Sequence, residues 1–87
     1  MAPAFNVSIV TPESIAYQGR AVSLIAPAEF GYMGVLANHA PLVAKLVRGT
    51  ITLMEPSGDK KKFGCTGDGF LEVVKNNATL LLDTISL

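Results

Sequence analysis

The sequence predicts an all-β domain, arranged as an antiparallel sandwich or barrel. Apolar and polar residues alternate with a period of two in several segments, as they do in strands with one buried face. Turn signals recur at intervals of roughly 8–12 residues, a spacing typical of such folds. Of the 87 residues, 49% are hydrophobic. A single domain of this size can therefore form a core without a metal ion or a disulfide.

The first third of the chain contains two predicted strands. In residues 5–10 (FNVSIV) every second residue is apolar, and the Thr-Pro-Glu segment at 11–13 ends the strand, because proline cannot donate to a sheet ladder. Residues 17–19 (YQG) predict a turn. Residues 20–27 (RAVSLIAP) then predict a second strand that ends at Pro27.

The second half of the chain contains the other predicted strands. Residues 49–55 (GTITLME) alternate in the same way, and the alternation resumes up to Cys65 after a turn. The run Lys60–Lys62 predicts an exposed edge that deters pairing with another chain. Residues 67–87 predict two strands joined at Asn76-Asn77, a dipeptide that tolerates the positive φ of a tight hairpin. Leu80 and Leu82 are expected to face the core from the last strand.

One segment departs from the strand pattern. In residues 41–48 (PLVAKLVR) the apolar residues fall at positions 42, 43, 46 and 47, and Pro41 stands where the first residue of a helix often does. The local pattern by itself predicts one short helix there.

Charge and cysteine content exclude several classes of function. Seven basic and seven acidic residues give a formal net charge of zero, whereas nucleic-acid-binding proteins usually have a basic surplus. Cys65 is the only cysteine, which excludes an intrachain disulfide and suits a reducing compartment. The first residues do not resemble a signal peptide, and no apolar run approaches the ~20 residues of a membrane span. Membrane contact is therefore expected only through partners.

The residues that could carry chemistry are few. Cys65 and His39 could form a thiol–imidazole pair, but a cysteine in an alternating strand is more often a small buried hydrophobe. One histidine and one cysteine do not make up a zinc site. The glycine-rich segment 64–69 (GCTGDG) lacks the order of a phosphate-binding loop and predicts a bend between strands. We therefore expect no catalytic, cofactor-binding or metal-binding residues.

The segment 30–43 (FGYMGVLANHAPLV) indicates a contact surface. Gly31 and Gly34 permit a tight projecting loop, with Tyr32 and Met33 as bulky apolar side chains at its tip. Exposed apolar groups of this kind suggest a patch for a partner. The single histidine in this segment has two open interpretations: a turn residue bonded to nearby backbone, or a direct contact.

Several motifs together resemble one family. They are GYMGVLANHAPLV, RGTITL, GDGFLEV, LLLDT and VTPESIAYQG, and their order and spacing match the N-terminal domain of the epsilon subunit of F-type ATP synthases. The resemblance runs from about Phe5 to Ile85. It implies a single domain over residues 1–87, a flattened antiparallel ten-stranded β-sandwich. It also implies that residues 41–48 are extended, and we expect tertiary pairing to override the local helical pattern.

The same resemblance implies a non-catalytic rotor subunit at the foot of the central stalk. Its implied partners are the gamma subunit, the c-ring of the membrane sector, and the rest of F1 through gamma. It would lie peripherally on the cytoplasmic face of the bacterial inner membrane and couple proton flow to ATP synthesis. Gly31, Tyr32 and Met33 align with the c-ring contact, and Thr11 and His39 align with the gamma-facing side. Tyr32 stands where many members have an acidic residue.

Typical members continue into a pair of C-terminal helices that can inhibit ATP hydrolysis, and this chain stops at Leu87. Either the helices were removed or the subunit is naturally short; a short subunit would lack the inhibitory arm. Two alternatives to the rotor subunit remain: a small β enzyme that uses Cys65 and His39, and a free regulatory binding module.

Overall fold

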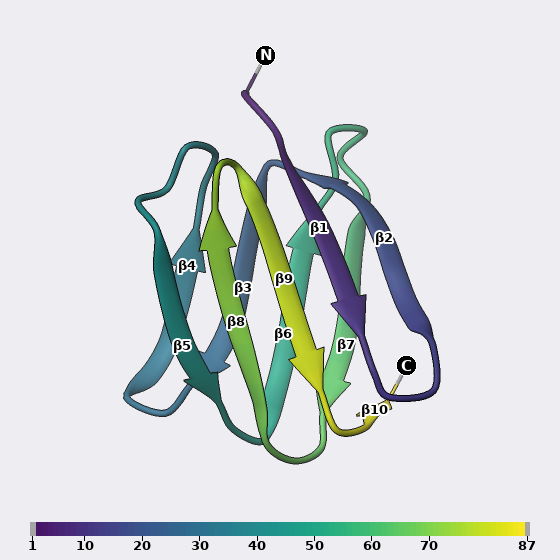
Figure 1. Ribbon diagram of the computed structural model, residues 1–87. Coiled ribbons are helices and arrows are strands. Elements are labelled where there is room, and N and C mark those ends of the chain that lie inside the picture. Colours follow the sequence, from purple (N-terminus) through teal and green to yellow (C-terminus); the bar gives the residue numbers. More distant parts are fainter. Residues whose placement is uncertain (1, 87) are drawn as a thin grey trace.

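The computed structural model describes residues 2–86, and every regular element among them is a β-strand (Figure 1). The predicted all-β class is therefore confirmed. The ten strands, in chain order, are β1 (Phe5–Val10), β2 (Ile15–Ala21), β3 (Ser23–Ala28), β4 (Gly31–Val35), β5 (Leu42–Leu46), β6 (Gly49–Met54), β7 (Lys60–Cys65), β8 (Gly69–Val74), β9 (Asn77–Leu82) and β10 (Ile85–Ser86).

The strands form one sheet that folds over on itself into two layers. Its order is β10-β7-β6-β3-β5-β8-β9-β1-β2, with β4 added beside β3. Strands β5, β8, β9, β1 and β2 make the front layer, and β4, β3, β6 and β7 lie behind them (Figure 1). The two layers are joined where Ala28 of β3 pairs with Leu46 of β5. This is the flattened ten-stranded sandwich that was expected, with one parallel pair, β1 with β9, among the antiparallel ones.

The core lies between the two layers and follows from the period-two pattern. Successive side chains of a strand point to opposite faces, so each strand gives alternate residues to the interior. The residues predicted to face inward are buried, from Phe5, Val7 and Ile9 on β1 to Leu80 and Leu82 on β9. The apolar residues of the other strands complete a continuous cluster. The Lys60–Lys62 run is exposed, as predicted, and β10 pairs only with the residues that follow it.

The local helical pattern of residues 41–48 gave a wrong prediction, and the extended conformation implied by the family resemblance is confirmed. Leu42–Leu46 is strand β5, and it pairs residue by residue with β8. Ala44 and Leu46 are buried while Val43 and Lys45 are exposed. A short segment obtains more hydrogen bonds and burial from a neighbouring strand than from one isolated helical turn, so tertiary pairing decides its conformation.

Two predicted strand boundaries, one inside β2 and one inside β3, are also wrong. Tyr17–Gly19 is not a turn, because these residues lie inside β2 and pair with β1. The turn comes earlier and is closed by the amide of Thr11, which donates to the Ser14 carbonyl oxygen at 2.9 Å. Pro27 does not end its strand either. It lies inside β3, where its carbonyl oxygen accepts a bond of 2.9 Å from the amide of Val47.

The β8–β9 hairpin turns one residue earlier than predicted. Lys75 and Asn76 have positive φ angles of 49° and 62°, as both central residues of a type I′ turn must. The side-chain amide of Asn76 also bonds to two other segments. Its oxygen accepts from the amide of Asn38 at 2.7 Å, and its nitrogen donates to the Ala4 carbonyl oxygen at 3.0 Å. These contacts hold three segments together at the end of the sandwich that is uppermost in Figure 1, which we call the upper end; the opposite end is the lower end.

The seam between the outer strands β2 and β7 is closed by side chains. The rings of Tyr17 and Phe63 pack at a centroid distance of 5.5 Å. The Tyr17 hydroxyl donates to a carboxylate oxygen of Glu55 at 2.6 Å. Burial, then the hydrogen bond to Glu55 and the charge of that carboxylate, raises the pKa of Tyr17 from 10.0 to about 12.

The raised pKa of Tyr17 predicts a loss of stability in alkaline solution. The folded state holds the phenol proton more tightly than the unfolded chain does, so its contribution is complete below pH 10 and is lost as the pH rises toward 12. We expect the free energy of unfolding to fall more steeply over this range in the wild type than in Tyr17→Phe. In a Tyr32→Phe background, the tyrosinate absorbance should titrate with a midpoint near 12. A midpoint near 10 would contradict the partly buried hydrogen bond between Tyr17 and Glu55.

Candidate protein interface

The outer surface of the front layer carries a row of exposed apolar side chains. Val10, Leu81 and Phe70 are neighbours across β1, β9 and β8 in the strand register. Phe70 and Leu81 are each 50% exposed, and Val43 on β5 is 68% exposed. Val74 extends the set toward the upper end of β8. We call the surface formed by these five side chains the front face.

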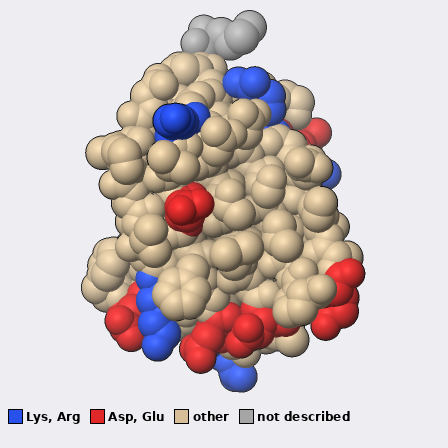
Figure 2. All heavy atoms as spheres, viewed as in Figure 1, with Lys and Arg blue, Asp and Glu red and all other residues tan. Residues whose placement is uncertain are grey.

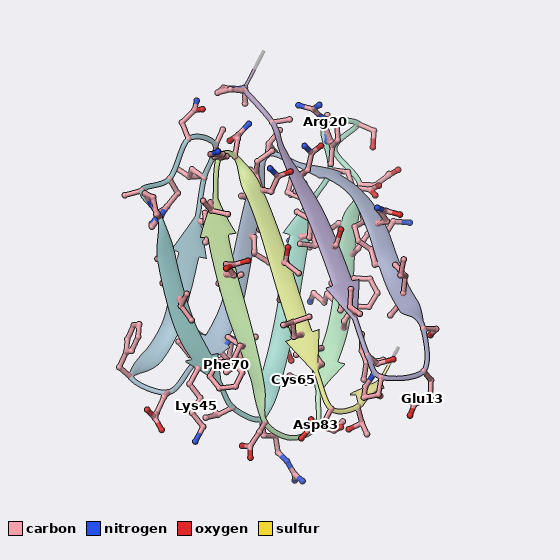
Figure 3. All side chains as sticks on the ribbon, viewed as in Figure 1. Glu13, Arg20, Lys45, Cys65, Phe70 and Asp83 are labelled. Carbon is pink, nitrogen blue, oxygen red and sulfur yellow. The ribbon has the colours of Figure 1, made fainter. Side chains whose placement is uncertain are left out.

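Charges are sparse on the front face and gather at its margins. Figure 2 shows a surface of mostly uncharged residues, with one acidic residue near its middle, acidic and basic side chains along its lower edge, and basic ones at its upper end. The register places Glu72 between Val43 and Thr79 inside this surface. Lys45 lies opposite Phe70 at the lower end (Figure 3) and forms an exposed ion pair with Glu29 at 3.7 Å. A largely apolar patch with a charged rim is the usual anatomy of a protein-binding surface.

The predicted contact loop at Gly31–Met33 has a different conformation from the one expected. These residues form the first part of strand β4 and pair with β3, so they are not a projecting loop. Only Gly31 of the two glycines has a positive φ, 130°. The tip of the β3–β4 hairpin is the turn at Glu29 and Phe30, and Phe30 is 76% exposed. Met33 is half-buried and packs against the core.

Tyr32 is exposed, but its hydroxyl already has a partner within the domain. The Tyr32 oxygen accepts a hydrogen bond of 3.0 Å from the amide of Thr50 on β6. The ring lies over Gly49, where a Cβ would stand 2.6 Å from the Tyr32 oxygen. Glycine at position 49 thus lets the tyrosine lie flat on the back layer. Its phenol is held in place, and its ring remains 62% exposed.

Thr11 and His39 lie at opposite ends of the front layer. Thr11 follows the end of β1, is 9% exposed, and donates its hydroxyl to the Ser14 carbonyl oxygen at 3.2 Å. His39 precedes β5 at the other end and is half-buried. Its Nδ1 lies 2.7 Å from the Ala40 carbonyl oxygen, and because a carbonyl only accepts, Nδ1 carries the proton. The structure does not bring the two together. Thr11 lines the same pocket as Phe70 and Leu81, and His39 follows Asn38, whose amide bonds to the β8–β9 turn.

The structure contradicts the thiol–imidazole pair. Cys65 is the last residue of β7 and lies at the lower end of the sandwich, where it pairs with Gly49 and Ile85. His39 lies at the upper end, next to Asn38, which bonds to Asn76 in the β8–β9 turn. Burial raises the pKa of the Cys65 thiol, which donates to the Gly67 carbonyl oxygen at 3.2 Å. A protonated, buried thiol is a poor nucleophile. Within residues 2–86 no group of three or more His, Cys, Asp or Glu side chains is placed to hold a metal ion.

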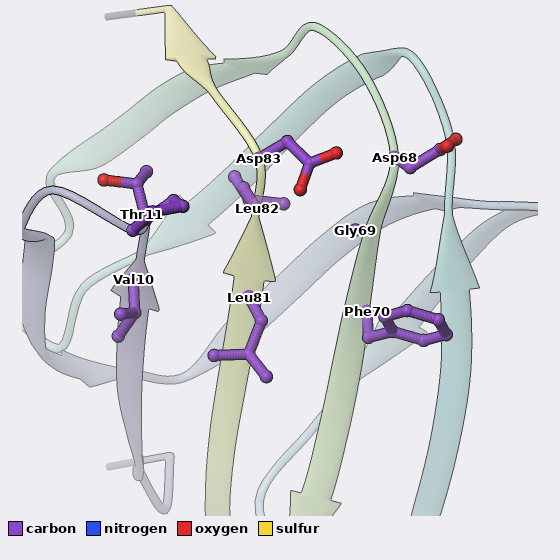
Figure 4. A pocket seen from close by; sticks show the side chains of 9 residues that line it. Val10, Thr11, Asp68, Gly69, Phe70, Leu81, Leu82 and Asp83 are labelled. Carbon is purple, nitrogen blue, oxygen red and sulfur yellow. The ribbon is translucent and has the colours of Figure 1, made fainter.

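A pocket of about 410 Å³ opens at the lower end of the front face (Figure 4). Val10, Leu81 and Phe70 lie side by side along it, and the carboxylates of Asp68 and Asp83 stand beyond the ends of β8 and β9. Sequence reasoning did not single out Phe30, Val43, Phe70 or Leu81. The signal was available, because these apolar residues occupy turn or outward-facing positions in strands whose alternate residues were assigned to the core.

Comparison with known proteins identifies one family. The family model described as the β-sandwich domain of the ATP synthase delta/epsilon chain matches residues 4–87. The ATP synthase epsilon chain of Leptospira borgpetersenii is 42% identical over 78 residues, which are 90% of this chain and 60% of the relative. That of Dichelobacter nodosus is 37% identical over 83 residues, 95% of this chain and 57% of the relative. This chain thus spans about 60% of the length of these relatives.

Two solved structures share the fold. A chain in the cryo-EM structure of the Euglena gracilis mitochondrial ATP synthase, which comprises OSCP, F1 and the c-ring, matches with a TM-score of 0.86 at 20% identity. It covers 98% of this chain and 54% of that one. A chain of the central stalk and c-ring of Tetrahymena thermophila ATP synthase matches with a TM-score of 0.75 at 15% identity, over 92% of this chain and 63% of that one. At these identities the likeness establishes the fold.

Proposed function

This chain belongs to the family of ATP synthase delta/epsilon chain β-sandwich domains, and from that premise we propose that it is a non-catalytic subunit of the central stalk of an F-type ATP synthase. In this role it binds the gamma subunit and the c-ring and couples proton flow through the membrane to ATP synthesis in F1. The proposal concerns the sandwich. Inhibition of ATP hydrolysis belongs, by the resemblance, to the C-terminal helices of typical family members.

The observation that carries the proposal is the exposure of apolar side chains on the front face. Phe70, Leu81 and Val43 expose half or more of their surface on one flat layer, and free monomers rarely leave such a patch uncovered. Aromatic and aliphatic side chains at the centre of a patch are the usual anchors of a protein interface. We assign this face to the gamma subunit. Thr11 and His39, at its two ends, would then lie at the rim of that contact.

The lower end of the sandwich is the part that we assign to the c-ring. The β3–β4 hairpin ends there, with Phe30 at its tip and Tyr32 beside it, and both rings are exposed. Gly31 and Met33 complete the hairpin strand. Apolar rings on a rigid hairpin fit a contact with loops of the membrane sector.

The proposed position is peripheral, on the cytoplasmic face of a bacterial inner membrane, where gamma links the domain to the rest of F1. The two relatives described above are bacterial ATP synthase epsilon chains, which supports this placement. Among residues 2–86 no helix is long and apolar enough to cross a membrane. Membrane contact through partner subunits is thus part of the proposal.

Calorimetric titration of the chain into purified gamma subunit of the same ATP synthase tests the proposal. We expect one-to-one binding. His39→Ala should bind roughly threefold to tenfold more weakly, as expected for a contact at the rim of an interface. Its free energy of unfolding should change by less than about 0.5 kcal/mol, because the His39 bond to Ala40 is exposed. An equal affinity of both proteins would make His39 a residue of the turn only.

The two alternatives predict different results in the same titration. A free regulatory module would remain a stable monomer without affinity for gamma. A folded chain that does not bind gamma would therefore overturn the rotor proposal. The enzyme alternative required Cys65 and His39 within hydrogen-bond reach, and they lie at opposite ends of the sandwich.

A further inference from the structure

We propose that the pocket at the lower end of the front face binds a basic side chain, lysine or arginine, of the gamma subunit. The inference rests on the proposed function, since it names the chemistry of the partner at one part of the same surface. The aliphatic stem of that side chain would lie on Val10, Leu81 and Phe70. Its charged group would lie at the end of the pocket that Asp68 and Asp83 line.

The apolar wall of the pocket suits the stem of a long side chain. Val10 pairs with Leu81, and Leu81 pairs with Phe70, so three apolar side chains lie in one row across three strands. Phe70 and Leu81 are half exposed, which leaves apolar surface for an occupant to cover. Lysine and arginine commonly bury their methylene groups on such surface while their charge stays at its edge. The volume of about 410 Å³ is ample for one such side chain.

The polar end of the pocket supplies the opposite charge. Asp68 precedes β8 and Asp83 follows β9, and the amide of Asp83 donates to the Asp68 carbonyl oxygen at 3.3 Å, so the two segments are neighbours. Both residues are exposed and line the pocket. In Figure 4 the carboxylate of Asp83 extends toward β8, and that of Asp68 extends away from Asp83. Within the part of the chain that the structure describes, neither carboxylate has an ion-pair partner. A cation at this end of the pocket would be attracted by both charges and would form a charge-assisted hydrogen bond with a carboxylate that it reaches.

The position of the pocket favours gamma as the source of the cation. Its apolar wall is the lower row of the front face, so any partner that covers this face also reaches the pocket. A side chain that fills a pocket continuous with a flat apolar patch fixes the register of the complex. Basic groups on the c-ring are the competing occupant, because the β3–β4 hairpin ends at the same edge of the sandwich.

The test compares two variants that change the net charge by the same two units. Asp68→Asn with Asp83→Asn removes both pocket charges, and Asp59→Lys, in the turn between β6 and β7, is the matched control outside the pocket. Neither variant changes a core residue, and thermal unfolding verifies that each variant folds. Binding to purified gamma of the same ATP synthase is measured at several salt concentrations. We expect the pocket variant to bind gamma about tenfold more weakly at low salt, as for a removed ion pair. Its affinity should also lose most of its dependence on salt concentration. The control should bind with an affinity close to that of the wild type.

Each outcome decides the proposal. Equal affinity and equal salt dependence of the pocket variant and the control would overturn the inference and leave the rotor function standing. A pocket variant that binds gamma normally but captures purified c-ring more weakly would also overturn it, in favour of the c-ring as the source of the cation. Failure of the folded wild-type chain to bind gamma at all would overturn the proposed function and this inference together.

Discussion

Truncation of Leu80 to alanine is expected to lower the free energy of unfolding by about 2–5 kcal/mol. Leu80 is fully buried at the centre of the interior, on a strand flanked on both sides by β1 and β8. The loss combines reduced apolar burial with the cavity that the rigid neighbouring strands cannot fill. A domain of this size is stable by only about 5–15 kcal/mol. The variant should therefore unfold at a clearly lower urea concentration.

Leu81→Ala is the matched control for this prediction. Leu81 is the next residue on β9, carries the same side chain, and is 50% exposed because it points to the front face. Its truncation should cost much less stability than that of Leu80, since its methyl groups already contact solvent. Similar losses for the two variants, measured by urea unfolding, would show that the register of β9 is wrong by one residue.

Phe70→Ala is expected to weaken binding to the gamma subunit by about 30-fold, or about 2 kcal/mol, as for a central aromatic anchor. Phe70 lies between Lys45 and Leu81 on the front face and is half exposed, so it contributes little to the core. Its aromatic ring presents the largest rigid apolar surface of the face. Calorimetric titration into purified gamma measures the loss.

The control for Phe70 is Ile25→Ala on the opposite layer. Ile25 is 46% exposed on β3, a similar fraction to that of Phe70, but it faces away from the front face. We expect Ile25→Ala to bind gamma as the wild type does. Equal weakening by both variants would indicate a general loss of folding, and weakening by Ile25→Ala alone would move the gamma contact to the back layer.

Much of the fold could be predicted from single residues and their spacing. Alternation identified β1, β6 and β9 and the burial of Phe5, Leu80 and Cys65. The candidate interface was less predictable. Segment 30–43 was correctly recognised as containing exposed apolar side chains, but its glycines were interpreted as hinges of a loop. Gly31–Val35 forms a paired strand instead, because β3 offers it a full ladder of hydrogen bonds.

The sequence by itself determined which faces of the strands are buried, since a period of two is a property of the chain and needs no partner. It also indicated a turn at Asn76-Asn77, because asparagine tolerates positive φ locally, although the positive φ angles fall on Lys75 and Asn76. Tertiary structure decided the conformation of Leu42–Leu46, which became a strand because β8 lies beside it. It also decided the pairing of Val10, Leu81 and Phe70, because neighbours across strands depend on register, and register is fixed only when distant segments meet in one sheet.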